Sequence, residues 1–145
     1  DYYTPAWLFE RMGITFDVDV ASPPGGLSWI PAARYFTKED DGLAQEWTGR
    51  VWMNPPFSKP APWIDKFIAH GNGICLVPCG RARWYIDLWA KADGICTPGR
   101  FSFAAGRIDA SGKLNGDIRF PVKIAAFGAE CVEAISRIGV VRVVA

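Results

Sequence analysis

The chain has 145 residues and a mass of 16.0 kDa, near the commonest size for one domain. Half of its residues are hydrophobic and 21% are charged, which excludes a disordered or low-complexity chain. No apolar run approaches the roughly 18 residues of a membrane span, and no stretch has the pattern of a signal peptide. We therefore expect a single domain over residues 1–145, located in the cytoplasm and without membrane contact.

The charge is unevenly distributed along the chain, although the net charge is only +1. Residues 1–58 hold four basic and eight acidic side chains, whereas residues 79–123 hold eight basic and four acidic ones. An acidic half suits a cationic ligand and a basic half suits a polyanion. Ordinary scatter of surface charge produces similar counts, so the charge alone does not select a partner.

Metal binding and thiol or histidine catalysis find little support in the residue types. The cysteines form no C-x-x-C pair and the chain has one histidine, so a zinc site lacks its usual ligands and we expect no metal. We expect His70 to end a helix beside Gly71 rather than act as a catalytic base. The cysteines lie mostly in apolar runs and are expected to be small buried side chains in a reducing compartment: Cys75, Cys79, Cys96 and Cys131.

Short elements separated by turn residues are expected in the first third of the chain. Thr4 as N-cap and Pro5 at the first helical position open a helix, which Gly13 closes. Residues 16–20 alternate apolar and acidic side chains, as a half-buried strand does. Residues 21–34 form a loop rich in proline and glycine, long enough to carry a function.

Helices and strands are expected to alternate in the rest of the chain. We predict helices over 62–70, 82–92 and 129–137, and strands over 50–53, 74–77, 94–96 and 140–144. Segments 100–105 and 118–127 are predicted to pair antiparallel across a turn at 109–112. This order predicts a compact α/β sandwich, with a mostly parallel sheet, helices on both faces and an antiparallel hairpin near the C-terminus.

Asn54-Pro55-Pro56-Phe57 is the sharpest chemical signal in the sequence. Two prolines directly after a strand remove two backbone N–H donors and stiffen the exit. The carbonyl oxygens of Asn54 and Pro55 are then available as acceptors, and Phe57 adds a flat aromatic face. Two acceptors beside an aromatic ring suit a planar amine, such as a base flipped out of a duplex. A rigid turn that merely ends the strand is the plainer interpretation.

The same four residues match the [D/N/S]-P-P-[Y/F/W] signature of amino-methyltransferases, and three further segments accompany them. Tyr3-Thr4-Pro5 looks like the Y-T-P element of the adenine enzymes, and Asp19-Val20-Ala21-Ser22 is similar to their D-P-A-x. Asp41-Gly42-Leu43 is similar to their D-x-L element. Together with residues 99–103, these segments make the chain resemble the phage-type DNA N6-adenine methyltransferase (Dam) family over nearly its full length.

This resemblance implies a Rossmann-like methyltransferase fold and methyl transfer from S-adenosylmethionine to the exocyclic amine of adenine in DNA. It implies a phage or prophage enzyme related to restriction-modification systems, acting in a bacterial host. The expected catalytic residues are Asn54, Pro55, Pro56 and Phe57, and the expected cofactor-binding residues are Tyr3, Thr4, Pro5, Asp19, Ala21, Ser22 and Asp41. From the basic segment we expect DNA contacts by Arg81, Arg83, Arg107, Lys113 and Arg119.

The sequence also departs from the family pattern. The G-x-G that usually follows D-P-A-x is replaced by Pro23-Pro24-Gly25-Gly26, and Phe57 stands where tyrosine is commoner. Only 22 positions separate Asp19 from Asp41, so the acid that usually binds the cofactor ribose is missing or is replaced by Glu39 or Asp40. We expect no separate target-recognition domain within 145 residues.

Other functions remain open at this point. Methyl transfer to cytosine N4 or to a glutamine amide uses a similar tetrapeptide. Carbon-5 methylation of cytosine is suggested by Val77-Pro78-Cys79, but no glutamate lies between Glu46 and Glu130 to engage the base. A non-catalytic module that binds single-stranded nucleic acid is suggested by the tryptophans, most of which we expect in the core: Trp29, Trp47, Trp52, Trp63, Trp84 and Trp89.

Overall fold

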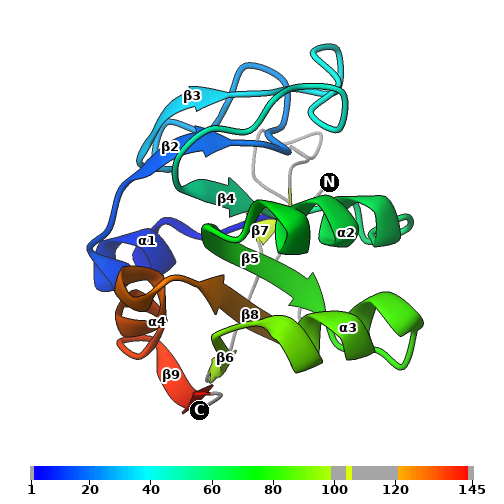
Figure 1. The fold of residues 1–145 in the computed structure, drawn as a ribbon. Coiled ribbons are helices and arrows are strands. Elements are labelled where there is room, and N and C mark those ends of the chain that lie inside the picture. The colour runs from blue at the N-terminus through cyan, green and yellow to red at the C-terminus, as the bar shows by residue number, and fades with distance from the viewer. Residues whose placement is uncertain (1, 99–103, 106–120, 144–145) are drawn as a thin grey trace.

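The computed structural model describes residues 2–98, 104–105 and 121–143 (Figure 1). Its helices are α1 (Ala6–Met12), α2 (Ala61–His70), α3 (Arg83–Lys91) and α4 (Ala129–Ile135). Its strands are β1 (Tyr2–Tyr3), β2 (Phe16–Asp19), β3 (Ala32–Tyr35), β4 (Val51–Met53), β5 (Gly73–Pro78), β6 (Gly94–Pro98), β7 (Ala104–Ala105), β8 (Val122–Phe127) and β9 (Gly139–Val143).

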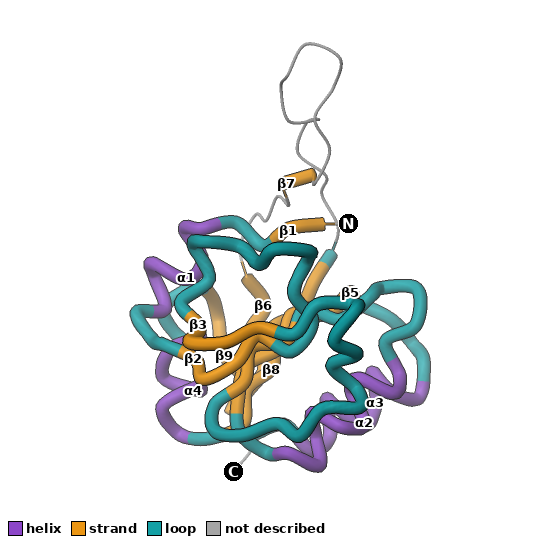
Figure 2. The backbone as a smooth tube through the Cα atoms, turned by 90° about the horizontal axis from the view of Figure 1, so that it is seen from above, coloured by secondary structure: helices purple, strands orange, loops and turns teal. Residues whose placement is uncertain are grey.

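Seven strands form one mixed sheet in the order β3-β2-β4-β5-β8-β6-β9. The first four of these are parallel, whereas β8 runs antiparallel to both β5 and β6, and β9 runs antiparallel to β6. Helices α1 and α4 lie on one face, and α2 and α3 lie on the other (Figure 2). The predicted α/β sandwich is confirmed at this level, while the sheet is mixed rather than mostly parallel in its pairings. The arrangement is compatible with a methyltransferase-like fold.

The core consists of two hydrophobic clusters, one on each face of the sheet. Successive strand residues point to opposite faces, so Ile74 and Leu76 join the cluster beneath α1 and α4. Cys75 and Val77 join the cluster beneath α2 and α3. Since both faces of β5 are covered, its sequence is apolar throughout rather than alternating, as expected for a central strand.

The start of the chain differs from the sequence prediction. Helix α1 begins at Ala6, and its N-cap is Pro5, which makes no side-chain capping bond. The prediction of Thr4 as N-cap is therefore wrong, because the Thr4 hydroxyl instead accepts a hydrogen bond from the Asn54 side chain. Gly13 does end the helix: its φ of 63° lies in the left-handed region, which glycine adopts without strain.

The loop predicted over 21–34 contains the beginning of a strand that the sequence pattern did not reveal. Residues Ala32–Tyr35 form β3, which pairs parallel with β2 at the edge of the sheet. Three of its four side chains are exposed and the fourth is half-buried, so β3 lacks the alternation that identifies a half-buried strand.

The predicted C-terminal hairpin is also different in the part of the chain that the structure describes. Residues Ala104–Ala105 pair with Tyr2–Tyr3, and β8 has β5 on one side and β6 on the other. These two segments therefore pair with other strands, and β8 is a central strand of the sheet. The predicted turn at 109–112 lies outside the described residues.

The remaining predicted elements are confirmed to within a few residues, and His70 does end α2. Three of the cysteines are buried, whereas Cys79 is exposed, which corrects its expected burial. Among the described residues, no group of three His, Cys, Asp or Glu side chains is placed to hold a metal ion. None of the described helices has the length and apolar character that crossing a membrane requires.

Candidate active site

The carboxyl ends of the parallel strands meet at one edge of the sheet. The arrows of β2, β4 and β5 all point toward this edge in Figure 1. Asp19 ends β2 and lies opposite Trp52 of the neighbouring strand β4, which Asn54 follows closely. The Val20 N–H donates to the Trp52 carbonyl oxygen at 3.1 Å and extends this pairing beyond β2. Ligands of open α/β sheets bind at such an edge. The two candidate site segments that begin at Asp19 and at Asn54 are therefore neighbours.

Asn54 is bonded to Thr4, which a third segment of the chain holds in turn. Its Nδ2 donates to the Thr4 hydroxyl oxygen at 3.2 Å, and Thr4 is only 1% exposed. The indole Nε1 of Trp29 donates to the Thr4 carbonyl oxygen at 2.8 Å, which fixes the backbone of Thr4 in turn. Three segments that lie 25 and 50 positions apart in the sequence are thus connected by two hydrogen bonds. This connection orients the Asn54 amide.

Asp19 is a buried carboxylate with little local compensation. It is 3% exposed, and its Oδ1 accepts a hydrogen bond from the Ala21 N–H at 3.3 Å. Burial raises the pKa of this carboxyl to about 7, because desolvation disfavours the charged form more than the Ala21 N–H favours it. No other residue in the described ranges donates to this carboxylate. A ligand that offers a hydrogen-bond donor or a positive charge here would stabilise its ionised form.

The loop after Asp19 is fixed against β3. The Ser22 N–H donates to the Phe36 carbonyl oxygen at 2.8 Å, and the Phe36 N–H donates to the Asp19 carbonyl oxygen at 2.8 Å. The buried Ser22 hydroxyl donates to the Pro23 carbonyl oxygen at 3.0 Å. Gly26 has a φ of 74°, and a Cβ there would lie 2.9 Å from the Tyr35 ring. The Pro/Gly-rich segment is therefore closely packed where it leaves β2 and where it meets Tyr35.

The turn that carries Asp41 packs onto the end of β2. A Cβ at Gly42 would lie 2.1 Å from the Val20 carbonyl oxygen, so only glycine permits this approach. Asp41 itself is exposed and has a φ of 56°. The Asp40 carboxylate accepts bonds from the Thr37 N–H at 2.8 Å and the Thr37 hydroxyl at 3.1 Å, so it stabilises the turn. This turn brings Asp41 next to the segment that begins at Asp19.

The remaining predicted residues are those expected to bind the cofactor, to catalyse the reaction or to contact DNA. Tyr3 lies in β1, and Pro5 precedes α1. Pro55 is buried, Pro56 is exposed, and Phe57 packs against the cluster beneath α1 and α4. The exposed Arg81 and Arg83 follow β5, and the Arg83 Nε lies 3.1 Å from Asp87 Oδ1 in an ion pair. Arg107, Lys113 and Arg119 lie outside the described residues, as does the segment 99–103.

Trp29 is the site residue that sequence reasoning did not assign. It lies in the Pro/Gly-rich loop, and its side chain remains 38% exposed although its indole N–H is bonded. The sequence signal that could have identified it is a large aromatic residue within a loop of proline, glycine and serine. The sequence contains no indication of its partner, because Thr4 lies 25 positions away.

These features are compatible with the methyltransferase-like class of α/β proteins: a three-layer sandwich, a buried acid after β2, and Asn-Pro-Pro-Phe after β4. The family profile described as DNA N-6-adenine-methyltransferase (Dam) matches residues 1–141, and the chain belongs to this family.

A curated relative is named DNA N-6-adenine-methyltransferase and comes from Haemophilus phage HP1 (strain HP1c1). It is 32% identical over 93 residues, which correspond to 57% of this chain and 52% of the phage protein. The chain thus spans about half the length of the curated relative that it matches. No solved structure matches the chain.

Proposed function

We propose that this protein transfers a methyl group from S-adenosylmethionine to the N6 amine of adenine in DNA. The observation that carries the proposal is the contact between Thr4 and Asn54 at the carboxyl edge of β4, beside the buried Asp19 of β2. Family membership and the name of the phage relative support the choice of adenine and DNA. We take the described sheet with its four helices as the catalytic domain.

Asp19 fits S-adenosylmethionine by its chemistry. The ligand carries an ammonium group and ribose hydroxyls, which are donors that a buried carboxylate with one backbone bond can accept. We assign Tyr3, Thr4, Pro5, Ala21, Ser22 and Asp41 to the same cofactor site, because their segments surround the ends of β2 and β4. When bound, the cofactor supplies an electrophilic methyl group on a sulfonium.

In this proposal, Asn54 and Pro55 bind the target amine. The lone pair of adenine N6 is delocalised into the ring, so the amine is a weak nucleophile. Hydrogen bonds from the amine to the Asn54 side-chain oxygen and the Pro55 carbonyl oxygen favour a pyramidal nitrogen and localise that lone pair. Phe57 stacks on the base, which must be flipped out or single-stranded, and Pro56 stiffens the segment. Orientation and electrostatics then lower the barrier without a strong base.

Thr4 acts as a positioning residue for this chemistry. Because its hydroxyl oxygen accepts from Asn54 Nδ2, the amide is oriented with its nitrogen toward Thr4. The amide oxygen is then directed away from Thr4, as acceptance of the target amine requires. Trp29 supports the arrangement through the Thr4 carbonyl oxygen.

DNA contacts are proposed for the basic residues that follow β5. Arg81 and Arg83 are exposed close to the carboxyl edge of the sheet, where phosphates of a bound strand would pass. Arg107, Lys113 and Arg119 complete the set as sequence-based proposals.

The experiment incubates the protein with methyl-labelled S-adenosylmethionine and unmethylated DNA, and then separates the nucleosides. We expect the label in N6-methyl-2′-deoxyadenosine, and we expect Asn54→Ala to lose it while still binding cofactor in calorimetry. Label in N4-methylcytosine would replace the adenine assignment. Unlabelled DNA together with tight DNA binding and no cofactor binding would contradict the proposal in favour of a nucleic-acid-binding module.

A further inference from the structure

The outer strands of the sheet are covered unequally on their two faces. On one face, Cys131, Ala134 and Ile135 of α4 bury the sheet residues beneath them. On the other face, α3 buries Leu88 against the sheet, but the edge strand β9 remains open, with Val140 82% exposed. The residues that point to this open side come from three strands and α3, and we call them the outer face: Trp89, Ile95, Thr97, Lys123, Val140 and Arg142.

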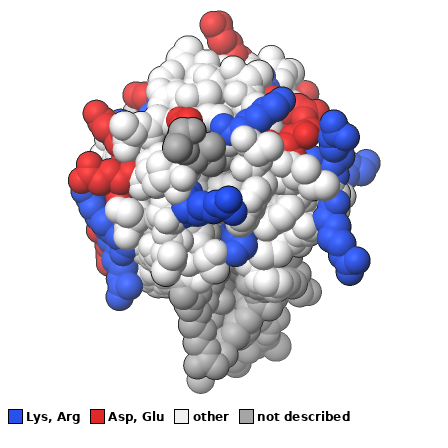
Figure 3. Space-filling model, turned by 60° about the horizontal axis from the view of Figure 1, so that its bottom comes forward, with Lys and Arg blue, Asp and Glu red and all other residues white. Residues whose placement is uncertain are grey.

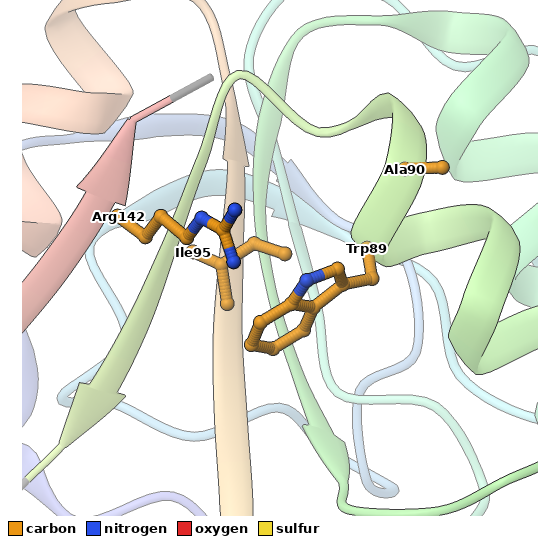
Figure 4. A pocket seen from close by; sticks show the side chains of 4 residues that line it. All are labelled: Trp89, Ala90, Ile95 and Arg142. Atoms are coloured by element: carbon orange, nitrogen blue, oxygen red, sulfur yellow. The ribbon is translucent and has the colours of Figure 1, made fainter.

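A hollow of about 230 Å³ lies within the outer face and is lined by Trp89, Ala90, Ile95 and Arg142. Figure 4 shows the Arg142 guanidinium and the Trp89 indole projecting into the same space above Ile95. On the Trp89 ring, Lys123 Nζ lies 5.7 Å from the centroid. The same ammonium donates to the Thr97 hydroxyl at 2.5 Å, which holds it over the ring.

The charge of the outer face has one sign. Strands β6, β8 and β9 contain Lys123 and Arg142 but no aspartate or glutamate. Arg142 forms no ion pair with any residue that the structure describes. Figure 3 shows the side of the molecule that includes β9 and α3, with Lys and Arg side chains near its middle and most acidic side chains nearer its rim.

We propose that the outer face is a second nucleic-acid contact, which binds a nucleotide of the strand that enters the site at Asn54. A nucleobase would replace the Lys123 ammonium over the Trp89 indole, because every base has a π face that stacks on an aromatic ring. Lys123 and Arg142 suit the phosphates on either side of that base. An apolar peptide would gain nothing from two cations, whereas a polyanion with planar groups uses both features.

The outer face lies within reach of the proposed active site. Lys123 is opposite Val77 near the carboxyl end of β5, and β8 is the second strand from β4. Strands in a sheet are about 4.8 Å apart, so Lys123 lies about 10 Å along the sheet from the strand that precedes Asn54. A strand extending from the target base covers this distance within a few nucleotides. Only this link to Asn54 rests on the proposed function.

The test measures binding without the methyl donor. Fluorescence anisotropy compares fluorescein-labelled single strands of about 20 and about 2 nucleotides, of which only the longer spans both contacts. We expect Arg142→Gln and Lys123→Gln each to weaken binding of the longer strand about fivefold and to lower its salt slope by about 0.7. The shorter strand should lose less. The matched control is Arg11→Gln on α1, which removes an exposed cation that also lies over an indole, 5.3 Å from the Trp7 centroid.

Each outcome decides between the two proposals. Variants that bind the longer strand as the parent does, or a parent that binds neither strand, overturn the outer face as a nucleic-acid contact. Weakened binding in a protein that methylates nothing supports the outer face and contradicts the proposed function alone. A concentration-dependent dimer in sedimentation that Val140→Glu abolishes overturns the proposal, because the face would then join two copies.

Discussion

The two ends of the sheet present opposite kinds of surface. At the carboxyl edge of β2 and β4, Thr4 and Asp19 are buried, and two hydrogen bonds connect Trp29 through Thr4 to Asn54. On the outer face, the cations are partly or fully exposed, and Arg142 has no charged partner among the described residues. Preorganised groups suit chemistry because they need no rearrangement during reaction, whereas exposed cations suit a long anionic ligand.

This contrast predicts different consequences of substitution. Changes at the carboxyl edge should alter turnover or cofactor binding with little dependence on salt. Substitution of the cations on the outer face, or of Arg81 and Arg83, should lower DNA affinity. The difference in affinity from the parent should become smaller as the salt concentration rises. A variant that moved both properties together would show that the two regions are not separate.

The largest effect is expected for Asn54→Ala. The side chain loses the acceptor proposed for the target amine, and we expect kcat to fall by about 100-fold or more. Cofactor affinity should stay within about twofold, because Asp19 and its loop do not depend on the Asn54 amide. Single-turnover methylation and calorimetry separate the two. Equal losses in both would place Asn54 in the cofactor site instead.

Asp19→Asn should have the next largest effect, on the cofactor. Loss of a charge-assisted hydrogen bond predicts at least about tenfold weaker binding. In the parent, the pKa of Asp19 is raised to about 7, so the carboxylate is mostly protonated below that pH. Cofactor affinity should therefore rise as the pH increases through 7, and Asp19→Asn should remove this rise. Calorimetry between pH 6 and 8 measures the cofactor affinity of both proteins. If the affinity of Asp19→Asn rises with pH as much as that of the parent, Asp19 is not the group responsible.

Asp19→Asn should weaken cofactor binding but raise the stability of the free protein above pH 7. Because the folded pKa lies above the unfolded one, the folded state holds a proton that the unfolded chain releases between about pH 4 and 7. Stability of the free protein should fall over that range and then level off. Asp19→Asn lacks this loss, so we expect a higher Tm than the parent above pH 7 and a smaller difference near pH 4. An equal difference at both pH values would contradict the buried-carboxylate argument.

Thr4→Val tests the contact that orients Asn54. Valine keeps the shape of threonine and removes only the hydroxyl, while Trp29 retains its bond to the backbone carbonyl oxygen. We expect kcat to fall about tenfold with KM for DNA nearly unchanged, because the amide of Asn54 loses its fixed orientation. Thr4→Ser restores a hydroxyl and should recover most of the activity. A serine variant as slow as the valine variant would indicate a packing role for the methyl group.

Much of this site could be predicted from the sequence, because the segments around Thr4, Asp19 and Asn54 end or follow elements with clear patterns. The structure places them together at the edge where parallel strands end. Thr4 was misassigned as a helix cap because capping is a local rule, whereas its partner lies 50 positions away. The insertion of β8 between β5 and β6 was equally hidden, since an apolar strand does not indicate its neighbours.

The smallest effect is expected from a matched pair of arginines at the boundary between the two regions. Arg81 and Arg83 are both exposed, but Arg83 pairs with Asp87 at 3.1 Å, so part of its charge is already balanced. Replacing Arg83 leaves the Asp87 carboxylate without this ion-pair partner.

If only the net charge of this segment matters, Arg81→Gln and Arg83→Gln should weaken DNA binding equally, because each removes one positive charge. If individual phosphate contacts matter, Arg81→Gln should weaken it about threefold and Arg83→Gln less, since Arg83 must leave Asp87 to reach a phosphate. We expect the second result, together with a smaller salt slope for Arg81→Gln. Anisotropy titrations of both variants at two salt concentrations measure it, with Arg83→Gln/Asp87→Asn as the charge-balanced control. Equal losses in both single variants would show that the segment with Arg81 and Arg83 attracts DNA through its net charge. Individual cation–phosphate contacts, as distinct from the hydrogen-bonded carboxyl edge, would then be expected only on the outer face.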